Sequence, residues 1–293
     1  MGKQSLREGT GARGPRRRSF WRRFLRNRRA SAGLLVLAFF CLLMALAPAV
    51  APYPAEKQIL VERLRPPTPH HWMGTDGLGR DVLSRAVFAS RVSLPIGLFS
   101  MLVSVSVGAS IGTVAGFLGG TVDNVLMRLT DLILSFPVIF LLLTMTTIFG
   151  RSVAILILLI GLTSWGSTAR VVRGQVLVLR ESGYVEAARM LGASSVRIML
   201  RHILPNTVPT IVVGATLRIA LGILIEGGLS FLGLGVQAPM PSWGNMIAEG
   251  RQFLRVAWWI SVFPGVFLFL CVMSINLVGD GLRDAVDPWL MNQ

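Results

Sequence analysis

From Glu186 to Pro205 the sequence reads EAARMLGASSVRIMLRHILP, a polar and basic stretch between two long apolar runs. The pattern predicts two short helices joined at Gly192, because glycine takes the positive φ of a helix C-terminal cap without a Cβ penalty. Ser194 or Ser195 is placed to cap the second helix, and Pro205 is expected to stop it. The stretch therefore predicts a helical hairpin. The alternative interpretation is an interfacial amphipathic helix with no docking role.

The composition of the whole chain indicates that this hairpin belongs to a membrane protein. Of 293 residues, 53% are hydrophobic and only 15% are charged, which is more apolar than soluble domains usually are. The net charge of +15 comes from 29 Lys and Arg against 14 Asp and Glu, and eleven of the basic residues lie in the first 29 positions. Basic residues directly before an apolar run are typical of a cytoplasmic anchor, so the charge does not predict a nucleic-acid partner.

Apolar runs that are long enough to cross a bilayer as helices recur six times. The predicted spans are 33–52, 92–122, 132–150, 152–169, 207–232 and 256–279. The sequence therefore predicts an all-α integral membrane protein with six transmembrane helices. Its parts are a basic cytoplasmic tail at 1–32, the first span at 33–52, an external loop with a short amphipathic helix at 53–91, a core of five helices at 92–279 that carries the hairpin at about 180–205, and a cytoplasmic tail at 280–293.

A second basic block follows the fourth span and fixes the expected topology. It consists of Arg170, Arg173, Arg180, Arg189, Arg197 and Arg201, opposed only by Glu181 and Glu186. Cytoplasmic loops carry such an excess of basic residues. Four crossings from a cytoplasmic N-terminus lead to the same side, so the hairpin and both termini are expected in the cytoplasm.

Small residues and one proline predict how the core helices pack. Gly108, Gly112 and Gly116 are four residues apart and share one helix face, where small residues let two backbones approach closely in lipid. Pro137 lies inside the third span, where it is expected to bend the helix.

Two charged residues, Arg218 and Glu226, interrupt the fifth span. They are eight positions apart and therefore lie broadly on one side of a helix. Charges inside a membrane usually face a protein interior or a water-filled cavity. Both residues are thus candidates for the lining of a translocation path. A structural ion pair or a contact with a partner subunit is the alternative.

Two motifs resemble a known family. The hairpin, through Glu186, Ala187, Ala188 and Gly192 and the later Leu204-Pro205, resembles the coupling loop of permease subunits of ATP-binding cassette importers. The segment GTDGLGRD at 74–81 resembles the C-type permeases for dipeptides, oligopeptides and nickel within the binding-protein-dependent transport system inner-membrane component family. For Asp76 and Asp81 in this segment, helix capping and salt bridges to Arg80 or Arg85 are favoured over catalysis, and His70-His71 is not expected to bind metal.

The resemblance implies a type I importer permease in the cell membrane, with peptide as the first substrate choice and nickel or glutathione left open. It implies a second homologous permease, two cytoplasmic ATPases that carry ATP and Mg, and an extracytoplasmic solute-binding protein. It also implies that Glu186, Ala187, Ala188 and Gly192 dock the ATPases. The chain has no phosphate-binding loop, catalytic motif or metal-ligand motif of its own, so we expect neither an enzyme nor a bound cofactor.

Two further hypotheses remain open from the sequence. One is a secondary transporter driven by an ion gradient, with Arg218 and Glu226 as its coupling pair. The other is a membrane scaffold whose basic tail binds anionic lipid or RNA.

Overall fold

The computed structural model describes residues 24–286, and the regular structure in this part of the chain is helical. Residues 1–23 of the predicted basic tail and residues 287–293 of the predicted C-terminal tail lie outside the described residues. The elements in chain order are α2 (Arg28–Val50), η1 (Leu60–Glu62), α3 (Val82–Leu118), α4 (Gly120–Ser135), α5 (Val138–Phe149), α6 (Val153–Leu179), α7 (Gly183–Met190), α8 (Ser195–Ile198), η2 (Met199–Ile203), α9 (Leu204–Phe231), α10 (Trp243–Gly250), η3 (Arg251–Phe253) and α11 (Trp259–Val286).

Five helical segments of the described chain are long and apolar enough to cross a membrane: α2, α3, α6, α11 and the continuous run from α8 to α9. The pair α4 and α5 passes the same test only when the two are joined, and it is bent by 85°. The bend lies at Pro137, which confirms the predicted kink.

Close packing between α3 and α6 shows that the bent pair must be a sixth crossing. A Cβ added to the glycines of α3 would lie 2.7 Å from Thr168 Cβ at Gly108, 2.4 Å from Ala169 O at Gly112 and 2.9 Å from Val176 Cβ at Gly116. The residue numbers rise together along both helices, so α3 and α6 run parallel. The chain between them therefore has to return across the membrane through α4 and α5, which agrees with the predicted number of six spans. The third span begins at Gly120 and not at residue 132 as predicted, because residues 120–131 are already helical in α4.

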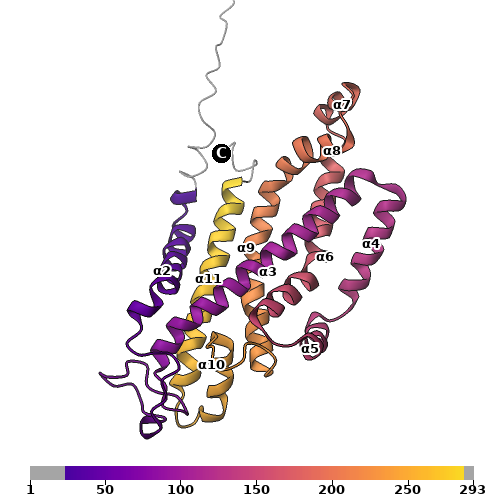
Figure 1. Cartoon of the computed structure of the whole chain (residues 1–293). Helices are drawn as coiled ribbons and strands as arrows, with labels where there is room; N and C mark the ends of the chain where they lie inside the picture. The colour runs from indigo at the N-terminus through magenta and orange to yellow at the C-terminus, as the bar shows by residue number, and fades with distance from the viewer. Residues whose placement is uncertain (1–23, 287–293) are drawn as a thin grey trace, which may run out of the picture.

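The two ends of the helix bundle are formed by different segments of the chain. Asn27 Nδ2 donates to Asp284 Oδ2 at 3.1 Å, which brings the start of α2 to the end of α11. Figure 1 shows this junction at the same end as α7 and α8, which we call the hairpin end. The segment 51–81 and α10 lie at the opposite end, which we call the loop end.

The long helix α3 begins earlier than predicted. The sequence predicted a separate short amphipathic helix within 53–91 and a span from residue 92. Instead one helix of 37 residues starts at Val82 and continues through Pro95, with Asp81 as its N-cap. Asp81 Oδ2 accepts from the Ser84 N–H at 2.8 Å, and such a cap satisfies an N–H that has no partner inside the helix.

Two further boundaries differ from the prediction. Pro205 does not stop a helix, because the helical run continues past it into α9. A π-helical turn, η2, joins α8 to α9, so the chain stays helical from Ser195 to Phe231. At the other boundary, α11 continues to Val286 through the first part of the tail predicted at 280–293.

Candidate functional site

The hairpin consists of the short helix α7 and the helix α8, which meet at a glycine; unlike the predicted second short helix, α8 continues through η2 into α9. Gly192 follows α7 with a φ of +77°, in the left-handed region that favours glycine. Ser194 caps α8 by accepting from the Arg197 N–H at 3.4 Å. The hairpin is connected to α6 by the three residues 180–182 and to α9 by η2.

One face of the hairpin is buried and the other is exposed. Val185, Ile198 and Ile203 are buried in one apolar cluster with Val172 and Val176 of α6. This cluster fixes the hairpin to the end of the membrane helices.

On the exposed side lie Glu186, Ala187 and Gly192, and Ala188 is half-buried. Beside them, the side chains of Met190 and Leu191 are 82% and 88% exposed. Large apolar side chains exposed together at a polar end of a protein mark an interaction surface.

Ion pairs support the helices beneath the hairpin. Arg173 of α6 donates through Nε and Nη2 to both carboxylate oxygens of Asp123 in α4, each at 2.5 Å. Arg170 forms a second, more exposed ion pair with Asp131 at 2.5 Å. A two-point arginine–carboxylate contact fixes orientation as well as distance, so α4 and α6 are joined firmly near the hairpin end.

A cavity of about 470 Å³ opens among α3, α5, α6 and α9. Its walls carry apolar side chains, several hydroxyl groups and one charged residue, Arg218. Arg218 Nη1 donates to the Ser164 carbonyl at 3.2 Å, and Nη2 donates to the Ser167 hydroxyl. The cavity thus contains one of the two predicted path residues.

Glu226, the other predicted path residue, lies elsewhere. Its side chain is fully buried and accepts from Ser230 at 2.7 Å, Ser242 at 2.8 Å and Ser93 at 3.4 Å. These serines belong to α9, to the loop before α10 and to α3. Glu226 therefore connects three segments near the loop end, and it shares no hydrogen-bond partner with Arg218.

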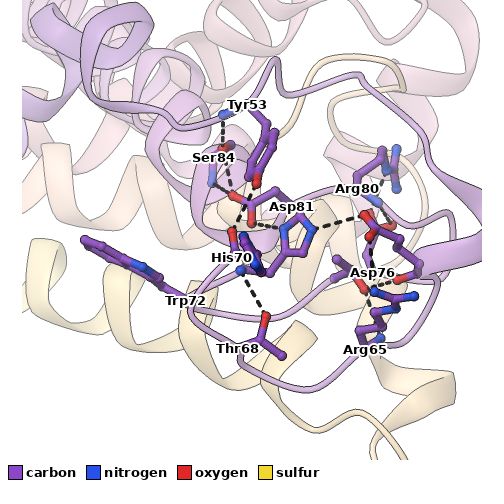
Figure 2. Close-up of polar contacts among 12 residues, drawn as sticks. Tyr53, Arg65, Thr68, His70, Trp72, Asp76, Arg80, Asp81 and Ser84 are labelled. Atoms are coloured by element: carbon purple, nitrogen blue, oxygen red, sulfur yellow. Dashed lines mark hydrogen bonds and ion pairs between the residues drawn. The ribbon is translucent and has the colours of Figure 1, made fainter.

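A charged network holds the segment 51–81 against α10 at the loop end. Asp76 Oδ2 accepts from Arg80 Nε at 2.6 Å and from Arg85 Nη1 at 2.5 Å. Both arginines also donate to Glu249 of α10, at 2.7 Å and 2.6 Å. Asp76 and Arg80 lie together at one side of the close-up in Figure 2. The predicted salt bridges of Asp76 are therefore confirmed, with Glu249 as an additional member.

His71 belongs to a second polar cluster of the same loop and has two acidic neighbours. Its Nδ1 lies 2.8 Å from Asp81 Oδ1, and its Nε2 lies 3.2 Å from Glu62 Oε2. Figure 2 shows Asp81 beside Ser84, whose hydroxyl donates to Asp81 Oδ2 at 2.7 Å. Both ring nitrogens are used in these contacts, and Asp81 is used in capping α3. These residues therefore hold the fold of the loop.

Glu249 and the cavity hydroxyls were not predicted from the sequence. Glu249 lies 164 positions from Arg85, and only the fold brings them together. The hydroxyls had a weak signal in the sequence, since Ser100 and Ser104 are four apart and Ser164 and Ser167 are three apart within apolar runs. Such spacing places each pair on one helix face.

Comparisons with known proteins agree with these features. A family model described as "Binding-protein-dependent transport system inner membrane component" matches residues 108–292, more than half of the chain. A second model, for the N-terminal transmembrane domain of oligopeptide transport permease C, matches residues 16–67.

Individual relatives cover nearly the whole chain. The chain is 44% identical to the glutathione transport system permease protein GsiD of Pectobacterium atrosepticum, over 93% of this chain and 91% of that protein. It is 39% identical to the dipeptide transport system permease protein DppC of Bacillus subtilis, over 92% and 85%. It is also 39% identical to the oligopeptide transport system permease protein OppC of Haemophilus influenzae, over 92% and 89%. The chain belongs to the family of binding-protein-dependent transport system inner membrane components.

Proposed function

We propose that this chain is the permease subunit of an ATP-driven importer for peptides, and that it forms the translocation path with a second homologous permease. The observation that carries the proposal is the exposed hairpin that continues through η2 into α9, a helix that lines the cavity. The named substrates of the relatives, glutathione, dipeptides and oligopeptides, are all peptides.

The hairpin is the proposed docking site for two cytoplasmic ATPases, through Glu186, Ala187, Ala188 and Gly192. ATP and Mg would be bound by those partners, since this chain has no phosphate-binding loop. A push on the hairpin would move α9 directly, because α8, η2 and α9 form one helical run. It would also move α6 through the short link at 180–182. Both helices line the cavity, so this motion would switch its access between the two sides of the membrane.

The loop end would face the outside and receive substrate from a solute-binding protein. The basic residues of the hairpin end favour a cytoplasmic position for the hairpin and for both termini. The apolar outer faces of the spanning helices would contact lipid, and the proposal includes no nucleic-acid partner.

The ion-coupled alternative has no support from the geometry. It requires Arg218 and Glu226 to act as a pair, but Arg218 contacts Ser164 and Ser167, whereas Glu226 contacts other serines. The scaffold hypothesis predicts that deletion of residues 1–23 abolishes function, whereas an importer that inserts normally is expected to retain most of its uptake.

Purification of the tagged chain in mild detergent tests the proposal. We expect two ATPases and a second permease to copurify, and we expect ATP hydrolysis by the complex to rise when a peptide-loaded binding protein is added. A chain that purifies alone, under conditions that preserve a known importer of this family, would contradict the proposal.

A further inference from the structure

Arg218 is a charged residue in the middle of a membrane-spanning helix without a carboxylate partner in the described chain. It lies half-buried near the centre of α9, and residues 24–286 contain no acidic side chain in an ion pair with it. Its two hydrogen bonds go to neutral oxygens, and they use two of the five N–H donors of a guanidinium. An unneutralised cation inside a membrane is costly and is typical of a functional site.

A second polar group in the same cavity also has no partner. The Ser104 hydroxyl is buried, with the residue only 1% exposed, and it forms no hydrogen bond in the described structure. Its neighbours in the cavity differ, since Ser100 and Thr163 donate to carbonyls of their own helices at 2.6 Å and 2.8 Å. A buried hydroxyl without a partner is unusual in a folded protein. Ser104 and Arg218 both line the cavity, and both have donors without a partner in the described residues.

The chemistry of the cavity fits an anion with an apolar body. Apart from Arg218, its lining residues are apolar or carry hydroxyl groups, and none is acidic. A volume of about 470 Å³ is within the usual range for sites that hold small molecules. A guanidinium and a hydroxyl are the donors that a carboxylate prefers.

We propose that this cavity binds the free carboxylate of a peptide in transit, with Arg218 and Ser104 as its donors. This inference rests on the proposed import of peptides. The alternative use of Arg218 is an ion pair with an acidic residue of the partner permease, which would cancel its charge. The two readings differ in the electrostatic potential inside the cavity of the assembled importer.

Thiol labelling of the complete importer in membrane vesicles measures this potential without any substrate. In a background with Cys41→Ala and Cys271→Ala, Ser164→Cys supplies a thiol at the cavity wall and keeps the backbone carbonyl that Arg218 contacts. The probes are the anionic 2-sulfonatoethyl and the cationic 2-trimethylammonioethyl methanethiosulfonates. We expect Arg218→Gln to lower the anion-to-cation ratio of labelling rates about tenfold, because one positive charge acts on both reagents at short range.

Two variants serve as controls. Arg218→Lys keeps the charge and is expected to keep the ratio. Arg255→Gln removes the same charge from an exposed position between η3 and α11 and is expected to leave the ratio unchanged. The inference is overturned if Arg218→Gln does not change the ratio, which is the result expected when a partner carboxylate neutralises Arg218. It is also overturned if neither reagent labels Ser164→Cys from either side.

Uptake by the same complex tests whether the anion is a peptide carboxylate. The probes are dialanine and dialanine amide. The same binding protein delivers both probes to every variant, so its own preference for one probe affects each ratio equally. We expect Arg218→Gln to lower the dialanine-to-amide ratio of initial rates about tenfold, and Arg218→Lys to restore it. An unchanged ratio contradicts the role of the carboxylate. Absence of peptide uptake by the wild-type complex contradicts the proposed function instead, while the labelling result still decides on the anion site.

Discussion

Gly192 sets the direction in which the coupling hairpin turns. Glycine is needed there because the backbone has a φ of +77°. A Cβ at this position would meet no atom within 4 Å, so the cost of a side chain is conformational and not steric. A β-branched residue at positive φ costs about 1–2 kcal/mol. A tenfold change in the ratio of the native turn to other conformations corresponds to about 1.4 kcal/mol. We therefore expect Gly192→Val to reduce uptake about tenfold and to weaken copurification of the ATPases, with normal insertion into the membrane.

Gly183→Val is the matched control for this variant. Gly183 begins α7, has an ordinary φ, and also has open space around its Cβ position. Its variant should keep near-normal uptake. Equal effects of the two substitutions would show that the hairpin surface, and not the turn at Gly192, is the sensitive feature.

Glu226 separates the importer from the ion-coupled alternative. Three serine hydroxyls converge on its carboxylate inside the protein. The amide oxygen of glutamine still accepts hydrogen bonds from hydroxyls. We expect Glu226→Gln to assemble and to transport within about twofold of the wild type, measured as uptake in vesicles supplied with ATP. Loss of uptake in an intact complex, together with sensitivity to an ionophore, would instead support a coupling role for this carboxylate.

At the level of elements, α3 and α6 approach each other closely along the glycine face of α3. Gly112 lies where a Cβ would be 2.4 Å from the Ala169 carbonyl oxygen, which belongs to the backbone and cannot rotate away. Forcing a methyl group into such a contact costs about 1–3 kcal/mol. We expect Gly112→Ala to lower the thermal midpoint of the purified complex by about 3–8 °C, as followed by a fluorescence shift in detergent.

Gly174→Ala is the control for the close contact. Gly174 lies on α6, and a Cβ there meets no atom within 4 Å. Alanine is a better helix former than glycine, so this variant should be unchanged or slightly more stable. A fall in the midpoint of the same size as for Gly112→Ala would contradict the packing argument.

The elements that the sequence predicted well are those with a local physical cause. Apolar length identified the spans, Pro137 identified the bend, and the glycine at 192 identified the turn of the hairpin. The predicted stop at Pro205 was wrong because the π-helical turn η2 directly before it joins α8 to α9, so the helix continues past the proline. The start of α3 was misplaced because several residues before 92 are polar, yet Ser84, Arg85 and Ser90 are buried against the loop end.

For the whole molecule, the arrangement of the site depended on contacts that no local pattern contains. Arg218 and Glu226 share a helix, but their environments come from other segments: α6 supplies Ser164 and Ser167, whereas α3 and the loop before α10 supply Ser93 and Ser242. Sequence spacing placed both residues on one side of α9 and could not separate them. Only the packing of the surrounding helices distinguishes Arg218, the functional candidate, from Glu226, the structural group.

The parallel packing of α3 and α6 leads to a prediction for the topology of the whole chain. Because these helices run in the same direction, the turn before α4 and the turn after α5 must lie on opposite sides of the membrane. Thr121 and Arg151 are exposed residues at these two turns. In a background without Cys41 and Cys271, we expect a membrane-impermeant maleimide to label Arg151→Cys in intact spheroplasts and Thr121→Cys only after the membrane is opened. Labelling of both from one side would make α4 and α5 a re-entrant loop, and the parallel course of α3 and α6 would then have to be wrong.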